Sequence, residues 1–104
     1  MKCDVSKENE VKDAIESTVK YFGRLDAVVA CAGISVLGLT LTSKGNGLNM
    51  LEFEKAINVN VYGSVYVAKY AAVAMSKNEG RGKNGEKGVI IFVSSVAAEE
   101  GAKA

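Results

Sequence analysis

Few residues in this chain could take part in chemistry, and most of them follow short apolar runs. Cys31–Gly33 comes directly after the run Leu25–Ala30, and Ser94-Ser95 comes directly after Val89–Val93. A carboxylate, Asp4, stands near the first residue. Carboxylate, hydroxyl and exposed backbone groups can hold a polar ligand through hydrogen bonds. Whether they do so depends on whether the fold brings them together.

The residue types that are missing exclude several kinds of enzyme and site. The sequence has no histidine and only two cysteines, Cys3 and Cys31. Without histidine, the Ser-His-Asp hydrolases, the Cys-His proteases and histidine acid–base catalysis are excluded. Two cysteines form no disulfide framework and supply too few ligands for zinc. We therefore expect no metal site and a reducing, intracellular compartment.

Composition predicts one soluble folded unit. The 104 residues are 48% hydrophobic and 24% charged, which is typical of a single globular domain. Thirteen basic and twelve acidic side chains give a net charge of +1, so bulk charge favours binding neither to nucleic acid nor to anionic membranes. The longest nearly apolar run, Ala27–Leu39, is shorter than the roughly 20 residues of a membrane span. The first residues form no signal peptide or presequence, so no targeting segment is expected in this chain.

Hydrophobic periodicity predicts two long helices. Ser6 is expected to cap the first, over about Lys7–Phe22, and Gly23 to end it. Asn49 is expected to cap the second, which continues to about Ser76. The inward face of this second helix would carry Phe53, Ile57, Asn60, Ser64, Val67, Ala71 and Met75. Two polar side chains therefore interrupt an otherwise apolar face.

Short apolar runs between the helices are predicted to be strands. Leu25–Ala30 and Val89–Val93 are rich in valine and isoleucine, which favours strands buried on both faces of a parallel sheet. Asp4-Val5 would end an earlier strand. Gly33–Asn49 and Lys77–Gly88 are predicted to be loops, because they are rich in glycine and lack a sustained period.

The order of these elements is that of an alternating α/β protein. A strand end, a helix, a strand, a long helix and a strand predict a partial doubly wound parallel sheet of about three strands with two long helices. Ligands of such sheets bind beyond the carboxyl ends of the strands. Asp4, Gly33 and Ser95 fall at those ends, so we expect them to share one edge of the sheet.

Four motifs, in their order and spacing, resemble those of the short-chain dehydrogenase/reductase family. They are Asp4-Val5, Phe22–Gly33, Asn58–Gly63 and Ile90–Ser95. Within the family, Cys-Ala-Gly at Cys31 and the loop Ser43–Gly47 are most similar to the type-2 3-hydroxyacyl-CoA dehydrogenases. The resemblance implies that residues 1–104 are the central part of a single NAD(P)-binding Rossmann-like domain. They would lack its amino-terminal Gly-rich turn for the cofactor diphosphate and its later Tyr-x-x-x-Lys segment with the acid/base tyrosine.

The resemblance implies two catalytic residues in this chain. Ser95 corresponds to the serine that hydrogen-bonds the substrate carbonyl or alcohol, a task that suits a hydroxyl because it both donates and accepts. Asn60 corresponds to the asparagine whose backbone carbonyl holds a water of the proton relay. The structural alternatives are a strand-terminal serine that caps backbone, for which Ser94 is the better candidate, and a buried asparagine that ties the helix to a strand.

The resemblance also implies a cofactor contact at the strand ends. The residues concerned are Asp4, Val5, Cys31, Ala32 and Gly33. Asp4 would accept from the adenine amino group, and the small residues after the strand would let the adenosine approach the backbone. The alternatives are an acid that lies near Ser6 at a helix start and a tight exit from a strand. Similarity to the 3-hydroxyacyl-CoA dehydrogenases favours NAD over NADP.

The implied reaction is hydride transfer between NAD(P) and a secondary alcohol or ketone of the 3-hydroxyacyl-CoA or hydroxysteroid class. Without the diphosphate turn and the tyrosine, this chain is expected to be inactive alone. The alternative is a non-catalytic structural subunit, a truncated dehydrogenase held in a larger assembly. In both cases we expect a homo-oligomer or association through an exposed sheet edge and the long helix. The resemblance also implies mitochondria as a location.

Overall fold

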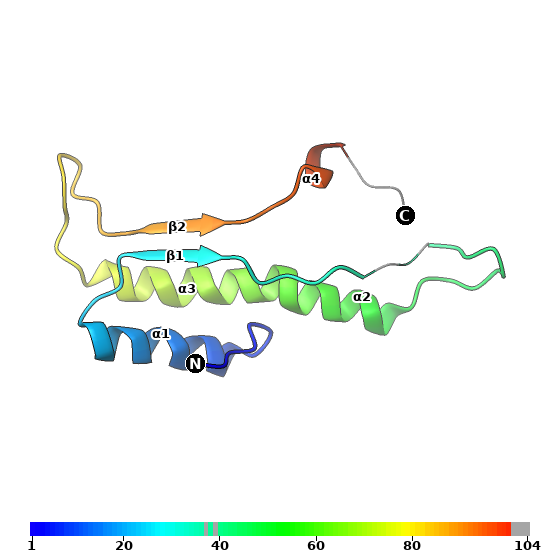
Figure 1. Cartoon of the computed structure of the whole chain (residues 1–104), viewed down its shortest axis with the longest axis horizontal. Coiled ribbons are helices and arrows are strands. Elements are labelled where there is room, and N and C mark those ends of the chain that lie inside the picture. Colours follow the sequence, from blue (N-terminus) through cyan, green and yellow to red (C-terminus); the bar gives the residue numbers. More distant parts are fainter. Residues whose placement is uncertain (37, 39, 101–104) are drawn as a thin grey trace.

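A computed structural model of the chain describes residues 1–36, 38 and 40–100 (Figure 1). Its elements in chain order are α1 (Glu8–Phe22), β1 (Ala27–Ala30), α2 (Met50–Ile57), the π-helical segment η1 (Asn58–Tyr62), α3 (Gly63–Ser76), β2 (Val89–Phe92) and α4 (Ala97–Glu100). The alternation of helices and strands confirms the predicted α/β class. Across the described residues, no helix is long and apolar enough to cross a membrane.

Helix α1 begins one residue later than expected and is not capped by Ser6. The hydroxyl and N–H of Ser6 both donate to Asp4 Oδ1, over 2.7 and 3.0 Å. The N-cap residue is Lys7, which makes no side-chain capping bond. The prediction for Ser6 is therefore wrong, because the Asp4 carboxylate competes for its hydroxyl. At the other end, Gly23 has a φ of 90° and its N–H donates to the Val19 carbonyl, which confirms the predicted stop.

Elements α2, η1 and α3 follow one another without a gap and form the long helix that the sequence predicts (Figure 1). Asn49 caps it, since its side chain accepts from the N–H groups of Leu51 and Glu52 over 3.0 and 3.4 Å. The five residues Asn58–Tyr62 in its middle widen into a π-helical turn. Such turns frequently occur at functional sites, and this one contains Asn60.

The segment between β1 and α2 forms no helix or named strand in its described residues, as predicted for Gly33–Asn49. An isolated antiparallel bridge joins Leu41 to Gly47 across a turn. Leu37 and Leu39 of this predicted loop, like the carboxyl-terminal residues 101–104, lie outside the described residues.

Strands β1 and β2 pair in parallel, and their register runs from Ala27 opposite Val89 to Ala30 opposite Phe92. The Val93 N–H donates to the Ala30 carbonyl over 3.2 Å and extends the pairing by one bond. The predicted parallel sheet is thus confirmed for these two strands.

The predicted end of an earlier strand at Asp4-Val5 belongs to a turn instead. The Lys7 N–H donates to the Asp4 carbonyl over 3.0 Å and closes this turn. The sheet of the described residues therefore has two strands. A strand needs a neighbour for its backbone groups, and no described segment pairs with Asp4-Val5.

Helix α3 packs against one face of the sheet and leaves the other face open. Val28 and Ile90 are half-buried, whereas Val29, Val89 and Ile91 keep 54%, 49% and 47% of their surface exposed. Side chains alternate between the faces of a strand, so the open face is apolar. None of the described helices covers the second face, so the burial on both faces that the composition of the strands favours is not complete within this chain.

The chain is more extended than a self-contained domain of its length. Its radius of gyration is 17.5 Å, whereas a compact domain of this length has a radius of about 13 Å. Its accessible surface of 8051 Å² exceeds the roughly 5,600 Å² of a folded monomer of this mass. Among the described residues, the buried apolar side chains are Val11 of α1 and Ala71 and Met75 of α3. Much apolar surface is therefore open to contacts with other protein segments.

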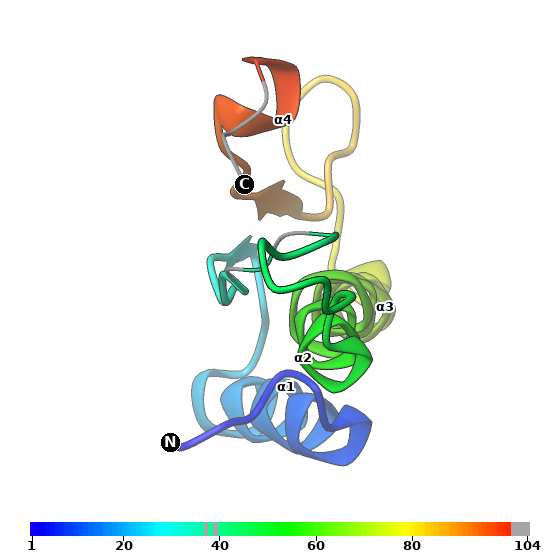
Figure 2. The same cartoon turned by 90° about the vertical axis from the view of Figure 1, so that its right-hand side faces the viewer.

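The carboxylate of Glu8 ties helix α1 to α3. It accepts from Lys69 Nζ over 2.9 Å and from the Tyr70 hydroxyl over 2.8 Å. These hydrogen bonds lower the pKa of Glu8, and the bond to Glu8 raises the pKa of Lys69. The contact holds the start of α1 beside the middle of α3, and α1 lies at the end of the molecule away from β2 (Figure 2).

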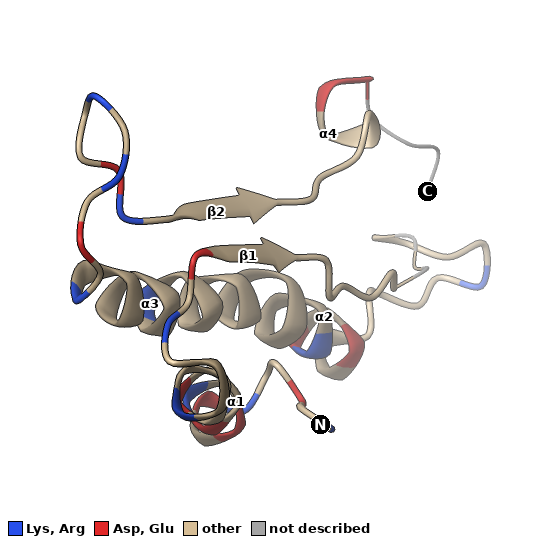
Figure 3. Cartoon of the chain, turned by 60° about the vertical axis from the view of Figure 1, so that its left-hand side comes forward, with Lys and Arg blue, Asp and Glu red and all other residues tan. Residues whose placement is uncertain are grey.

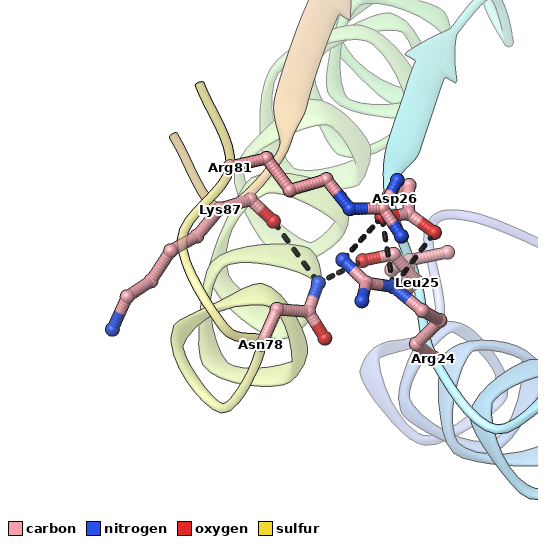
Figure 4. Close-up of polar contacts among 6 residues, drawn as sticks. All are labelled: Arg24, Leu25, Asp26, Asn78, Arg81 and Lys87. Atoms are coloured by element: carbon pink, nitrogen blue, oxygen red, sulfur yellow. Dashed lines mark hydrogen bonds and ion pairs between the residues drawn. The ribbon is translucent and has the colours of Figure 1, made fainter. Parts of the chain in front are cut away.

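The predicted loop Lys77–Gly88 is exposed, and it is anchored to the residues before β1 (Figure 4). Asn78 Nδ2 donates to the carbonyls of Leu25 and Lys87, over 2.6 and 3.0 Å. Arg81 contacts the Asp26 carboxylate over 3.8 Å. The loop carries basic and acidic residues, whereas both strands are uncharged along their length (Figure 3).

Candidate functional site

The two strands place candidate residues at one rim of the sheet. Because β1 and β2 are parallel and Ala30 pairs with Phe92, the chain leaves both strands at the same end of the sheet (Figure 1). Gly33 and Ser95 each follow their paired residue by three positions. Gly33 and Ser95 therefore share an edge of the sheet, as the order of elements predicts. Asp4 was expected at the same edge, but it follows no strand in the described residues.

A hollow of about 190 Å³ opens beside the end of β1. Its lining includes Val5, Cys31 and Ala32, for which the family resemblance implies a cofactor contact, together with Gly63 and Ser64 of α3. Gly63 is buried, and a Cβ there would lie 2.8 Å from Cγ2 of Val5. Any other residue at this position would displace Val5, so the absence of a side chain allows this approach. No role is predicted for Gly63 from the sequence. A glycine inside a helix costs about 1 kcal/mol relative to alanine, so its presence in the predicted long helix could have indicated a close contact.

Asp4 lines a second hollow, of about 250 Å³, together with Ser6, Ile34, Lys55 and Asn58. The bonds from Ser6 to its Oδ1 lower the pKa of the Asp4 carboxyl. An ionised carboxylate has two oxygens that accept, so Oδ2 can accept a further hydrogen bond. The structural alternative for Asp4, an acid that lies near Ser6 at the start of a helix, predicts this contact. The contact uses only Oδ1, so a ligand could still bind to Oδ2.

The Asn60 side chain ties η1 to the segment that follows β1. Its Oδ1 accepts from the Ile34 N–H over 2.9 Å, and its Nδ2 donates to the Ile34 carbonyl over 2.8 Å. A Cβ at Gly33 would lie 3.3 Å from the same Oδ1, so the turn fits closely around the amide. Asn60 is exposed rather than buried. Its side chain nevertheless joins the helix to the segment after β1, as the structural alternative for Asn60 predicts. Its backbone carbonyl accepts from the Ser64 hydroxyl over 2.8 Å.

We expect Asn60→Leu to loosen the turn after β1. The N–H and carbonyl of Ile34 would lose their partners, which costs about 1 kcal/mol in the free energy of unfolding for a site open to water. Amide hydrogen exchange at Ile34 should become faster in this variant. Asn58→Leu, in the same π-helical turn, is the matched control and should leave exchange at Ile34 unchanged. Equal amide exchange rates at Ile34 in the two variants would show that the Asn60 side chain does not hold the turn after β1.

Ser95 is exposed and uses its oxygen atoms in a local turn. Its Oγ accepts from the Ala97 N–H over 3.1 Å, and its carbonyl accepts from the Ala98 N–H over 3.0 Å. The capping role that the sequence assigns to Ser94 therefore belongs to Ser95, because α4 begins two residues after Ser95 and a capping oxygen reaches the N–H two or three positions later. The Ser95 hydroxyl proton is still free to donate to a ligand.

The cysteines and the acidic residues are the side chains best suited to hold a metal ion, and the cysteines could also supply a reactive thiol. The residues that the structure describes contain no group of three or more His, Cys, Asp or Glu side chains placed to hold a metal ion. Cys31 is free and exposed, and burial raises the pKa of the Cys3 thiol, which disfavours a reactive thiolate there. The groups that the rim offers to a ligand are Asp4 Oδ2, the Ser95 hydroxyl and the backbone of the turn after β1.

Comparison with known proteins gives one matching family and related enzymes. The family model described as enoyl-(acyl carrier protein) reductase matches residues 1–104. The 3-hydroxyacyl-CoA dehydrogenase type-2 of Rattus norvegicus is 42% identical over 99 residues, which cover 94% of this chain and 38% of the rat protein. The chain thus spans less than two-fifths of the length of this curated relative.

Solved structures share the arrangement of helices and strands. The crystal structure of 3-hydroxyacyl-CoA dehydrogenase type-2 from Mycobacterium avium matches with a TM-score of 0.85 and 32% identity, over 96% of this chain and 39% of that one. The structure of ElxO with NADP bound matches with a TM-score of 0.78 and 34% identity, over 98% of this chain and 37% of that one. The fold described above therefore matches part of a larger Rossmann fold.

Proposed function

The chain belongs to the short-chain dehydrogenase/reductase family, and from that premise we propose that residues 1–104 are the central part of a single NAD(P)-binding Rossmann-like domain. The whole domain would transfer hydride between NAD(P) and a secondary alcohol or ketone. The observation that carries the proposal is the parallel pairing of β1 with β2, which puts Cys31–Gly33 and Ser95 at one end of the sheet. In open α/β sheets, ligands bind at that end.

The cofactor would lie across the turn that follows β1. Cys31, Ala32 and Gly33 are small, so adenosine could approach their backbone. Val5 lines the hollow at the end of β1 together with Cys31 and Ala32. The ionised Asp4 carboxylate would accept from the adenine amino group. We favour NAD over NADP because of the similarity to 3-hydroxyacyl-CoA dehydrogenases.

Ser95 and Asn60 would be the contributions of this chain to catalysis. The Ser95 hydroxyl would donate to the substrate oxygen as negative charge develops on it. The backbone carbonyl of Asn60 would hold a water that relays protons, beside the Ser64 hydroxyl that it already accepts from. The name of the rat relative points to 3-hydroxyacyl-CoA as the substrate class. Hydroxysteroids are the second candidate, which the family resemblance suggests.

The sequence of 104 residues contains no Tyr-x-x-x-Lys, so the acid/base tyrosine expected of the family is not among them. We therefore propose that this polypeptide does not turn over substrate by itself. Its two free cysteines fit a reducing compartment, for which mitochondria are the candidate that the family resemblance suggests.

A non-catalytic role is the second candidate: a structural subunit, or a truncated dehydrogenase held in a larger assembly. The open sheet face favours it, because Val29, Val89 and Ile91 are about half exposed. The long helix also exposes apolar residues, with Val61 at 50% and Val65 at 57%. Association as a homo-oligomer, or with another chain, would then use the sheet edge and this helix.

A chimeric enzyme tests the proposed function. Residues 1–104 would replace the matching segment of the rat 3-hydroxyacyl-CoA dehydrogenase type-2, and NADH-dependent reduction of acetoacetyl-CoA would be measured. We expect the chimera to bind NADH and turn over, and the 104-residue chain alone to do neither. A folded chimera that binds no NADH would contradict the proposal. Tight NAD binding by the isolated chain would show that these 104 residues do not need the rest of the domain to hold the cofactor.

A further inference from the structure

A groove lies between α1 and α3, apart from the residues of the rim. Its volume is about 470 Å³. Ile15 and Val19 of α1 and Val73 of α3 give it apolar walls, and Val73 is 53% exposed. Glu16 and Lys20 line the same groove, so charged and apolar side chains of α1 alternate along it.

The two charges on α1 are available to another molecule. Glu16 and Lys20 are four residues apart and could pair within the helix. Glu16 instead contacts Lys12, over 3.9 Å and with the Glu16 side chain 62% exposed, and such an exposed pair contributes little. In the described part of the chain, Lys20 has no carboxylate within 4.0 Å.

We propose that this groove docks α1 of a second copy of the chain, with the two α1 helices antiparallel about a two-fold axis. A two-fold interface packs one surface patch against itself. Lys20 would meet the partner's Glu16, and Glu16 would meet the partner's Lys20. Ile15 and Val19 of both copies would pack between these two ion pairs. A parallel arrangement in register would instead bring like charges together, so the charge pattern selects the antiparallel one.

The ends of the helices favour the same orientation. Gly23 of α1 and Lys77 after α3 line the groove together, so the carboxyl-terminal ends of both helices lie at one end of it. The acidic first turn of α1 carries Glu8 and Glu10. An antiparallel α1 would bring this acidic turn toward the basic side chain of Lys77 at that end of the groove, so opposite charges would meet.

This association is separate from the proposed function. The residues that line the groove are not those that line the hollows at the rim. Docking of a second α1 would therefore leave the cofactor turn and Ser95 accessible. It would also leave the open sheet face free for the other contacts proposed above.

The test is sedimentation of the 104-residue chain over a range of concentrations, with circular dichroism to establish folding. We expect a dimer for the unchanged chain. Lys20→Glu should weaken it by about tenfold or more, because two-fold symmetry places two like-charge pairs at the interface. Glu16→Lys should do the same, and the double variant Glu16→Lys/Lys20→Glu should restore the dimer. Lys83→Glu, in the exposed loop, is the matched control and should change nothing.

Three results would overturn the proposal. A chain that stays monomeric at all concentrations has no such interface. A dimer that is insensitive to Lys20→Glu forms through another surface, such as the sheet edge. A folded double variant that associates no better than the single variants shows that Glu16 and Lys20 do not pair across the two-fold axis.

Discussion

Replacing Ser95 with alanine in the chimeric enzyme is expected to lower kcat by about 10²- to 10³-fold, the loss that follows removal of one preorganised donor to a developing oxyanion. The KM for NADH should change little, because the proposed partner of the hydroxyl is the substrate oxygen. The measurement is the initial rate of acetoacetyl-CoA reduction at saturating NADH. Ser94→Ala is the matched control and should keep near-normal activity.

Ser95 also caps α4, so the loss of activity has to be separated from a loss of structure. Aspartate is as good a cap as serine, but its ionised side chain accepts hydrogen bonds and donates none. Ser95→Asp should therefore retain the capping bond to the Ala97 N–H and still be inactive. Ser95→Thr keeps the hydroxyl and should recover activity. An active Ser95→Asp enzyme would show that Ser95 acts only through the turn before α4.

Gly63→Ala is expected to destabilise the chain by about 1–3 kcal/mol, the usual cost of overpacking. At an ordinary glycine inside a helix, replacement by alanine instead raises the free energy of unfolding by about 1 kcal/mol. The new Cβ would lie 2.8 Å from Val5 Cγ2 and 3.2 Å from the Val5 carbonyl oxygen. The side chain of Val5 can move, but its backbone can move only with the turn before α1. Urea unfolding of the chain or of the chimera measures the change.

Two variants accompany Gly63→Ala. Gly47→Ala is the matched control, since nothing lies within 4 Å of a Cβ there, and it should shift stability by less than about 0.5 kcal/mol. The double variant Gly63→Ala/Val5→Ala removes Cγ2 of Val5 and should recover part of the loss. If Gly63→Ala is as stable as the unchanged chain, the close contact between α3 and the residues before α1 is not present in solution.

The local elements could be predicted from the sequence because their signals are local. The Gly23 stop and the Asn49 cap each depend on residues within one turn of the helix, and both are confirmed. The strand runs Leu25–Ala30 and Val89–Val93 are also close to the observed strands. The shared edge for Gly33 and Ser95 then follows from parallel pairing.

Other expectations failed where neighbours in space decide the outcome. Burial of the strands on both faces depends on segments that this chain does not place there. Ser6 and Ser94 were predicted to cap backbone groups. The Ser6 hydroxyl donates to the Asp4 carboxylate instead, and the capping bond before α4 is made by Ser95, because α4 begins two residues after it. The bonds of Asn60 join residues 26 positions apart, so only the packed helix and strand could reveal them.

A crystal structure of the chimera with NAD and a substrate ketone tests the central claim most directly. We predict that the dinucleotide lies along the carboxyl ends of β1 and β2, with its adenosine over Cys31–Gly33 and the Ser95 hydroxyl within hydrogen-bond reach of the ketone oxygen. A cofactor that binds elsewhere, or a ketone that lies far from Ser95, would contradict the account.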